Sequence, residues 1–258
     1  MIASLQTRLS NVIVTRIVVL TALLTALELA CRLGAIDRVT MIPPTEMVAA
    51  LSQILASGQF DSDIAFTTGN IVAAVGLAVG LGFFVGAGLH ALPRLRRVIE
   101  PMLSAYYAIP TFIFYPLLIV IFGVGRTALI VMGAMFAIVA MIVNTILGLD
   151  RVPKVVRQSA VMLQLDWFRQ LILVRLPAAG PHLVTGLKLA VAYSVIGIVA
   201  GEFILATAGI GKRIAFAYDN FDNNTMYGML LLLLLGVIAV NGLLSTWERR
   251  LHRRFGQR

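Results

Sequence analysis

Six stretches of this sequence are each apolar over about 20 residues, the length with which an α-helix crosses the hydrocarbon core of a bilayer. They comprise residues 12–33, 64–89, 101–122, 127–148, 183–205 and 226–247. Hydrophobic residues make up 59% of the chain and charged residues 13%, whereas soluble domains average about 45–50% and about 25%. Runs such as 230–235 lack the alternation of a barrel strand. The sequence therefore predicts an all-α integral membrane protein, with six transmembrane helices in a single domain of residues 1–258.

The first apolar stretch could be a retained helix or a cleaved signal peptide. Arg8 and Arg16 lie near its start, and Leu29-Ala30-Cys31 faintly resembles a lipoprotein cleavage site. However, Glu28 interrupts the apolar run beside that site, and the run is longer than the roughly 7–15 apolar residues of a signal peptide. We expect a retained helix in which Glu28 pairs with Arg32 one turn later.

Basic residues gather in alternate loops, and this sets the expected orientation because cytoplasmic loops carry the excess of Lys and Arg. The rich segments are the N-terminus, the second loop, the fourth loop and the tail, with Arg8, Arg16, Arg94, Arg96, Arg97, Arg151, Lys154, Arg157, Arg169, Arg175, Arg249, Arg250, Arg253, Arg254 and Arg258. Both termini are therefore predicted to be cytoplasmic. The net charge of +9 follows from this topology. No aromatic residues alternate with the basic ones to stack nucleic-acid bases, so we expect no nucleic-acid partner.

The chain lacks the residue patterns of an enzyme or a metalloprotein. It has no G-x-x-x-x-G-K-[ST] phosphate loop, and no Ser, His and Asp set can be assigned to one membrane depth. Cys31 is the single cysteine, and His90, His182 and His252 stand apart from other ligand types at metal-binding spacing. We expect no catalytic residue, no metal and no cofactor bound by this chain, so the energy for any active transport must come from a partner.

A stand-alone channel or a secondary carrier is the alternative function. Ion-driven carriers usually place acidic or histidine residues at mid-membrane depth. Here Lys188 is close enough to the cytoplasmic end of its span to extend to the interface, and Glu202 lies near the outer end of the same span. A membrane scaffold that recruits a cytoplasmic enzyme and transports nothing is a third class that remains open.

The third span is interrupted by prolines among aromatic residues. Pro110 and Pro116 each remove a helical hydrogen bond, so a kink is expected, and discontinuous helices at membrane depth tend to border cavities. Position and chemistry select six candidates for a substrate pathway: Tyr106, Pro110, Phe112, Tyr115, Asn144 and Glu202. Ordinary core packing or surface pairing is the alternative for each of them.

The second span carries glycines at regular intervals. They form two small-xxx-small pairs, Gly76 with Gly80 and Gly82 with Gly86. Such pairs let the backbone of a second helix approach closely. We therefore expect this span to pack tightly against a neighbouring helix.

The fourth loop, residues 150–182, is polar enough to leave the bilayer and still has the apolar periodicity of a helix. Pro153 suits a first helical position, and Asp166 can cap a second helix, so two short helices are predicted with an exposed elbow at 164–166. Leu176-Pro177 is expected to end the helical run. The loop could lie on anionic lipid through its arginines, or it could dock into a groove of a cytoplasmic protein.

This loop resembles the signature of permease subunits of binding-protein-dependent ABC importers. That signature reads E-A-A, three residues, G, nine residues, I, any residue, L-P. The chain has Gln158-Ser159-Ala160, three residues, Gln164, nine residues and then 174–177, which read Val-Arg-Leu-Pro. The spacing matches throughout, while Gln158, Ser159 and Gln164 depart from the signature residues.

Three further stretches are similar to permeases of the nitrate, sulfonate and taurine importers. These are Ile42-Pro43-Pro44-Thr45, Ala108-Ile109-Pro110 followed by Phe122-Gly123-Val124-Gly125, and Gly201-Glu202 followed by Gly209-Ile210-Gly211. Asn70 is a departure, because many members of this class carry arginine there. The order and spacing of the motifs carry the resemblance over nearly the whole chain.

The resemblance implies a multi-pass protein of the bacterial cytoplasmic membrane that pairs with a second permease copy, usually as a homodimer. Two cytoplasmic ABC ATPase subunits, which would hold ATP and Mg²⁺, are expected to bind the loop, and a substrate-binding protein is expected to dock outside. The residues implied in ATPase coupling are Gln158, Ser159, Ala160, Leu163, Gln164, Leu165, Asp166, Trp167, Val174, Leu176 and Pro177. The solute would be a nitrate-, sulfonate- or taurine-like anion or a vitamin precursor. Because the spans lack fixed positive charge, neutral heterocycles also remain possible solutes.

Overall fold

The computed structural model describes residues 2–254, and it describes side chains over 14–250 except at 154, 157, 159, 161, 167, 168 and 205. Every regular element over residues 2–254 is helical, with no strand. The chain forms two compact units: Met1–Asp61 with Arg213–Leu233, termed unit 1, and Ser62–Lys212 with Leu234–Arg258, termed unit 2. The all-α prediction is confirmed for the described residues.

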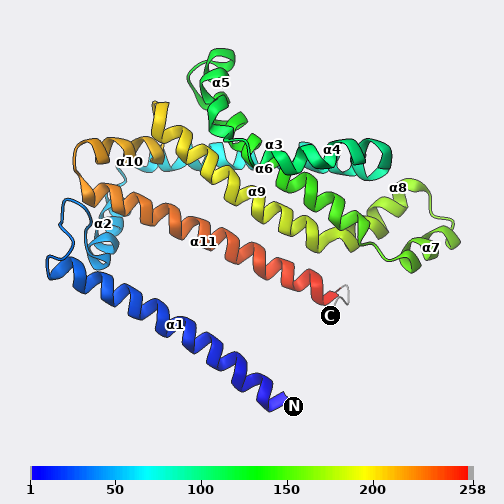
Figure 1. Ribbon diagram of the computed structural model, residues 1–258, viewed down its shortest axis with the longest axis horizontal. Helices are drawn as coiled ribbons and strands as arrows, with labels where there is room; N and C mark the ends of the chain where they lie inside the picture. The colour runs from blue at the N-terminus through cyan, green and yellow to red at the C-terminus, as the bar shows by residue number, and fades with distance from the viewer. Residues whose placement is uncertain (1, 255–258) are drawn as a thin grey trace. The chain divides into compact units, whose positions relative to one another are not determined.

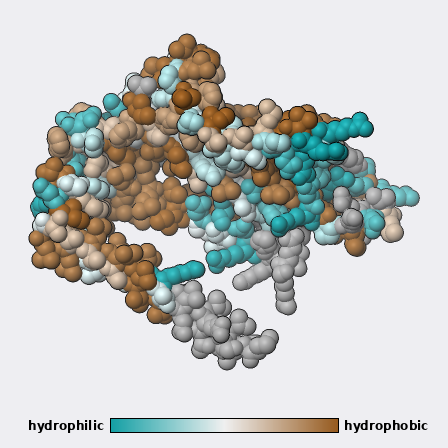
Figure 2. All heavy atoms as spheres, in the orientation of Figure 1, coloured by the Kyte–Doolittle hydropathy of each residue, from teal (hydrophilic) through white to brown (hydrophobic). Residues whose placement is uncertain are grey.

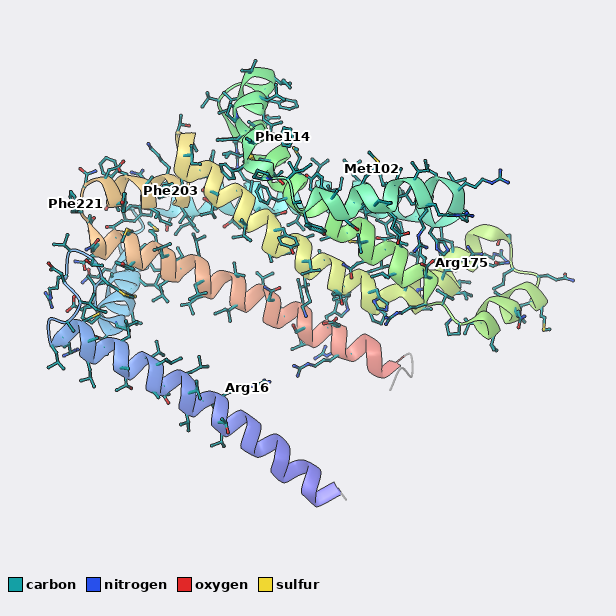
Figure 3. All side chains as sticks on the ribbon, viewed as in Figure 1. Arg16, Met102, Phe114, Arg175, Phe203 and Phe221 are labelled. Carbon is teal, nitrogen blue, oxygen red and sulfur yellow. The ribbon has the colours of Figure 1, made fainter. Side chains whose placement is uncertain are left out.

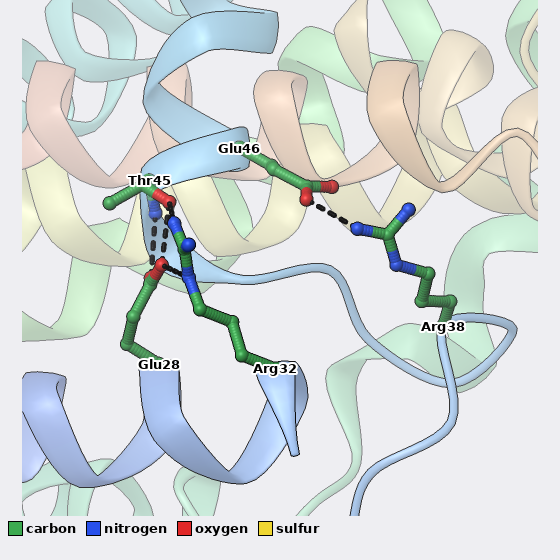
Figure 4. A network of polar contacts seen from close by, with 5 residues as sticks. All are labelled: Glu28, Arg32, Arg38, Thr45 and Glu46. Atoms are coloured by element: carbon green, nitrogen blue, oxygen red, sulfur yellow. Dashed lines mark hydrogen bonds and ion pairs between the residues drawn. The ribbon is translucent and has the colours of Figure 1, made fainter. Parts of the chain in front are cut away.

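Unit 1 contains α1 (Ile2–Arg32) and α2 (Pro44–Ser57), joined by an irregular segment (Figure 1). The predicted pair of Glu28 and Arg32 is present, with Nε of Arg32 2.6 Å from Oε1 of Glu28. The same carboxylate also accepts hydrogen bonds from the backbone N–H and the hydroxyl of Thr45, at 3.1 and 2.7 Å (Figure 4). Because Pro43, the residue before α2, has no side-chain oxygen, Glu28 satisfies a free N–H of the first turn of α2 from the neighbouring helix.

Unit 1 also includes the start of α11 (Asn223–Arg254), which holds the segment between α1 and α2. The Asn223 side-chain amide donates to the carbonyls of Arg38 and Val39, and the Tyr227 hydroxyl donates to that of Thr40 at 2.6 Å. A Cβ at Gly228 would lie 2.6 Å from Cδ1 of Ile54. A side chain at this position would have to displace Ile54, so glycine favours the close approach of α2 and α11.

Unit 2 is built on α6 (Arg126–Asp150) and α9 (Leu176–Leu205), which lie side by side along their lengths (Figure 1). Its other elements are α3 (Asp61–Ala91), α4 (Pro93–Tyr106), η1 (Thr111–Phe114), α5 (Tyr115–Phe122), α7 (Lys154–Met162), α8 (Trp167–Gln170), η2 (Leu171–Arg175), the first turn of α10 (Ile210–Asp219) and the end of α11. A Cβ at Gly133 of α6 would overlap Ile198, and one at Gly197 of α9 would lie 3.0 Å from Cα of Gly133. Glycine at these positions explains the close approach of the two helices.

The glycines of the second span divide into two kinds. At Gly82 and Gly86, an added Cβ would lie 2.8 and 2.7 Å from Cβ of Met141 and Thr145 on α6. At Gly76 and Gly80 it would meet no described atom within 4 Å. The packing prediction is confirmed for Gly82 and Gly86, while Gly76 and Gly80 face no other described helix of this chain. The sequence shows the spacing of small residues and not which face meets a neighbour.

The described part of the chain has five helices long and apolar enough to cross a membrane, in the ranges Val14–Arg32, Asp61–Ala91, Arg126–Asp150, Leu171–Ile204 and Asn223–Arg250. The third predicted span, 101–122, is instead a pair of helical segments, Pro93–Tyr106 and Thr111–Phe122, that meet at 93°. The break confirms the disruption expected at Pro110. Six spans result if this bent pair counts as one, and the pair begins eight residues before the predicted boundary because α4 starts at Pro93.

Unit 2 carries a polar cluster where α3 and α6 end and α4 begins. Asp150 of α6 accepts a 2.6 Å hydrogen bond from Nη1 of Arg96 and lies 2.9 Å from Nδ1 of His90. Figure 2 shows hydrophilic side chains projecting from unit 2 near the start of α4 and around α7 and α8. In the same unit, Lys188 of α9 contacts Glu248 of α11 at 2.9 Å, a partner 60 residues away that no sequence spacing indicates.

Candidate functional site

The break in the third predicted span opens a pocket of about 340 Å³ in unit 2. It is lined by Tyr106, Tyr107, Ile109, Pro110, Thr111, Phe112, Phe136, Tyr193 and Ile196. The first six come from the end of α4 and the break, Phe136 from α6, and the last two from α9. Figure 3 shows Phe114 at this turn, where the chain leaves the direction of α4. Discontinuous backbone therefore borders a cavity here, as expected for broken helices at membrane depth.

The pocket walls are mostly aromatic rings. The ring centroids of Tyr107 and Tyr193 lie 6.4 Å apart, and those of Phe112 and Phe136 lie 6.2 Å apart. The Tyr106 hydroxyl donates to the carbonyl of Met135 at 2.8 Å, which ties the end of α4 to α6. The pocket thus has mostly aromatic and apolar walls with a few hydroxyl groups.

Three of the six predicted pathway residues line this pocket: Tyr106, Pro110 and Phe112. Tyr115 is buried in the core between α5 and α6, and Asn144 donates its side-chain amide to the carbonyl of Ala140 within its own helix. Sequence reasoning did not single out Phe136 and Tyr193, which come from distant spans. Aromatic composition alone could not have placed them, because each span contains several aromatic or apolar residues.

Glu202, the last predicted pathway residue, is fully buried in a polar cluster of unit 2. Its Oε2 accepts hydrogen bonds from the Thr67 hydroxyl at 2.7 Å and from the backbone N–H of Gly211 at 3.1 Å. The Thr67 oxygen in turn accepts from the N–H of Ile210 at 2.8 Å, and Asp63 accepts from the N–H of Gly209 at 2.9 Å. Three successive backbone donors after α9 are thereby satisfied by side chains of α3 and α9.

The close contacts around Glu202 require glycine at positions 209 and 211. Gly209 has a φ of +108°, and a Cβ there would overlap the carboxylate of Glu202. A Cβ at Gly211 would overlap the backbone carbonyl of Val199. The Gly201-Glu202 motif and the Gly209-Ile210-Gly211 motif therefore contact each other directly.

Asn70 lies one turn after Thr67 on α3 and is also fully buried. Its Oδ1 accepts a 3.1 Å hydrogen bond from Nε of Arg126, whose guanidinium lies 4.9 Å from the ring centroid of Phe66. At the position where the family resemblance led us to expect an arginine, this chain thus has an asparagine that binds an arginine from α6. Nδ2 of Asn70 and Oε1 of Glu202 have no hydrogen-bond partner among the described residues.

The loop between α6 and α9 forms the two predicted short helices, α7 and α8, with an elbow between them. Asp166 caps α8, because its Oδ1 accepts a hydrogen bond from the N–H of Arg169 at 3.3 Å. Gln164 has a φ of +49°, a left-handed conformation that glycine adopts at little cost. The signature glycine therefore corresponds to a position where this backbone turns through positive φ.

The expectation that Leu176-Pro177 ends the helical run is wrong. The chain stays helical from Trp167 to Leu205, and residues 171–175 form the π-helical segment η2. The N–H of Leu176 donates to the carbonyl of Leu171, five residues back, and Pro177 falls in the first turn of α9, where its missing N–H is tolerated. Figure 3 shows Arg175 at this junction.

The predicted coupling residues differ in exposure. Gln158, Leu163, Gln164 and Asp166 are exposed, Leu165, Val174, Leu176 and Pro177 are half-buried, and Ala160 is buried; the side chains of Ser159 and Trp167 lie outside the described residues. Next to the elbow, Met162 and Leu163 are 83% and 71% exposed. No group of three or more His, Cys, Asp or Glu residues that could hold a metal ion occurs in the described part of the chain.

Comparison with known proteins assigns the family. Residues 78–257 match the family described as binding-protein-dependent transport system inner membrane component. The taurine transport system permease protein TauC of Escherichia coli (strain K12) is 28% identical over 254 residues, 93% of this chain and 92% of TauC. The putative aliphatic sulfonates transport permease protein SsuC of Bacillus subtilis (strain 168) is 25% identical over 223 residues, 85% of this chain and 79% of SsuC.

A solved structure is similar in fold. A chain of the MetNI methionine ABC transporter in an inward-facing conformation has a TM-score of 0.65 and 20% sequence identity, and the similarity covers 74% of this chain and 95% of that chain. The family match extends over most of the chain, from α3 through α11. The chain therefore belongs to the binding-protein-dependent transport system inner membrane component family.

Proposed function

We propose that this chain is the membrane permease subunit of an ATP-driven importer of the bacterial cytoplasmic membrane. Two copies form the pathway for a small polar solute, which an extracytoplasmic binding protein delivers. The chain has no ATPase site of its own, and two cytoplasmic ABC ATPase subunits hold ATP and Mg²⁺. Both termini lie in the cytoplasm. The family match over residues 78–257 carries this proposal.

The exposed elbow of unit 2 supports a docking role for the loop. Two large apolar side chains, Met162 and Leu163, extend into solvent beside a capped helix of only four residues. Exposed apolar side chains that cluster on a projecting element typically mark a protein interface. The elbow between α7 and α8 is thus the surface on which we expect an ATPase subunit to dock.

The names of the relatives indicate a broad class of solute. TauC and SsuC are named for taurine and aliphatic sulfonates, so we propose a small polar solute for this chain as well. Selectivity is then shared between the binding protein and the pathway between the two permease copies.

Co-purification tests the proposal. We expect the full chain, extracted from its native membrane in mild detergent, to bring with it a nucleotide-binding subunit at one copy per permease, identified by mass spectrometry. The double variant Met162→Ala with Leu163→Ala should lose that subunit, because the apolar anchors of the interface are gone.

The matched control changes two side chains of equal exposure outside the loop, Val120→Ala with Phe84→Ala, at 83% and 73% exposed. This control should retain the ATPase subunit. Recovery of the permease alone from wild-type membranes would favour the stand-alone channel or carrier. Equal loss in both double variants would show that the elbow is not the docking surface.

A further inference from the structure

The pocket at the break between α4 and α5 has walls suited to one chemical class of solute. Rings from four parts of the chain border it: Tyr107 directly after α4, Phe112 from η1, Phe136 from α6 and Tyr193 from α9. Its volume of about 340 Å³ falls within the usual range of small-ligand sites, about 300–1,000 Å³. The site is therefore large enough for a small ring system.

Charge is absent from the lining. None of the nine lining residues is acidic or basic. Arg126, the arginine at the start of α6, hydrogen-bonds Asn70 and lies over the ring of Phe66, and none of these three residues lines the pocket. A nitrate or sulfonate ion would leave water at this site without a cationic partner, and a bare ammonium would do so without an anionic one, which is costly for either.

The polar groups of the lining are hydroxyls, and two of them are already engaged. Tyr106 donates to the carbonyl of Met135, and Thr111 donates to that of Ile109 at 3.4 Å. The hydroxyls of Tyr107 and Tyr193 have no hydrogen-bond partner among the described residues. These two rings offer both a stacking face and a group that can donate or accept one hydrogen bond.

We propose that this pocket binds an uncharged, planar nitrogen heterocycle, held by stacking on Tyr107, with the Tyr193 ring, tilted 46° to it, against the edge of the ligand, and by hydrogen bonds from the two hydroxyls. Aromatic rings hold flat π-systems irrespective of sequence or charge, and hydroxyls satisfy the polar edge without requiring an ion pair. The inference rests on the proposed permease function, because it assigns the solute class of the same pathway.

Ligand-observed fluorine NMR tests the pocket directly, with 5-fluorocytosine as the probe and the full chain reconstituted in lipid nanodiscs. We expect the probe signal to broaden with the wild-type chain and to recover when unlabelled cytosine is added. Nitrate, taurine and choline, which carry fixed charges, should not displace the probe at the concentration at which cytosine does.

The variants Tyr107→Leu and Tyr193→Leu should each weaken probe binding about tenfold or more, because one aromatic contact and its hydroxyl are lost. Tyr107→Phe and Tyr193→Phe should retain most of the binding, since the ring remains. Phe84→Leu is the matched control, because this exposed ring of α3 does not line the pocket, and it should bind the probe as the wild type does.

Displacement of the probe by nitrate, taurine or choline as readily as by cytosine would overturn the inference, as would full binding by both leucine variants. An absence of broadening with the wild-type chain would also overturn it. If the same preparation still carries an ATPase subunit on the elbow, the permease function stands and only the solute class is wrong. Loss of the ATPase partner with intact probe binding would contradict the proposed function instead.

Discussion

The hydroxyl of Thr67 donates a 2.7 Å hydrogen bond to Oε2 of Glu202, and both side chains are fully buried in unit 2. The hydroxyl oxygen of Thr67 also accepts a hydrogen bond from the N–H of Ile210 at 2.8 Å, so one threonine on α3 connects the end of α9 with the start of α10. A carboxylate in an apolar span requires such partners, because an unsatisfied polar group there is costly. Glu202 thus organises the turn after α9.

Replacing Thr67 with valine keeps the shape of the side chain and removes the shared hydroxyl. The Ile210 N–H would lose its acceptor and Glu202 would lose one donor. We therefore expect the free energy of unfolding to fall by about 1–3 kcal/mol. The apparent unfolding temperature of the detergent-purified protein measures the loss. Thr25→Val is the control, since the exposed Thr25 hydroxyl bonds only the carbonyl of Thr21 in its own helix. Equal shifts in the two variants would contradict the role of the shared hydroxyl.

Gly209→Ala should destabilise unit 2 by more than about 1 kcal/mol. Its φ of +108° disfavours any side chain, and the new Cβ would overlap the carboxylate of Glu202. Gly76→Ala should have the opposite sign, with a gain of about 0.5–1 kcal/mol, because this helical glycine has no described atom within 4 Å of an added Cβ. An unfolding temperature that does not fall in Gly209→Ala would show that the close contact at Gly209 is not limiting, and one that falls in Gly76→Ala would show that Gly76 is not in open space.

The sequence indicated that Glu202 stands apart from ordinary apolar residues of its span, and it could not indicate why. Its partner Thr67 is 135 residues away, and pairings across that distance depend on how α3 and α9 pack. Asn144 has a local partner instead. Its amide donates to a carbonyl of its own helix, a contact that composition does not reveal, and its pathway role stays a prediction.

Features that depend on residues close together in the sequence agree better with the structure. The elbow between α7 and α8 was predicted from a capping residue and apolar spacing, and Asp166 does cap α8. The break near Pro110 was predicted from the missing N–H of proline. The helix end expected at Pro177 was wrong, because the π-helical segment η2 lets the helix continue through a proline in the first turn of α9. A hydrogen bond that spans five residues does not change the spacing of apolar residues, so the sequence could not indicate this π-helical segment.

Gln164→Gly should stabilise the elbow by up to about 1 kcal/mol, because left-handed φ is unfavourable for a residue with a Cβ and Gln164 has a φ of +49°. Gln158→Gly is the control within α7, where glycine should cost about 1 kcal/mol relative to a good helix former. Hydrogen exchange over residues 154–170 measures both changes, with slower exchange expected in the first variant and faster exchange in the second. Faster exchange in Gln164→Gly would show that the positive φ stores no strain.

Glu202→Gln separates a structural role of this residue from ion coupling. Glutamine keeps the shape and one acceptor oxygen, so it can still accept from Thr67 and from the N–H of Gly211, and the fold should survive. Glu202→Leu removes both acceptors and should strongly reduce the yield of folded protein. We therefore expect the purified Glu202→Gln complex to hydrolyse ATP at close to the wild-type rate, whereas an ion-coupled carrier would need the ionisable carboxyl. Loss of ATP hydrolysis by a folded Glu202→Gln complex would contradict a purely structural role, since the remaining contacts of the side chain would be those of the wild type.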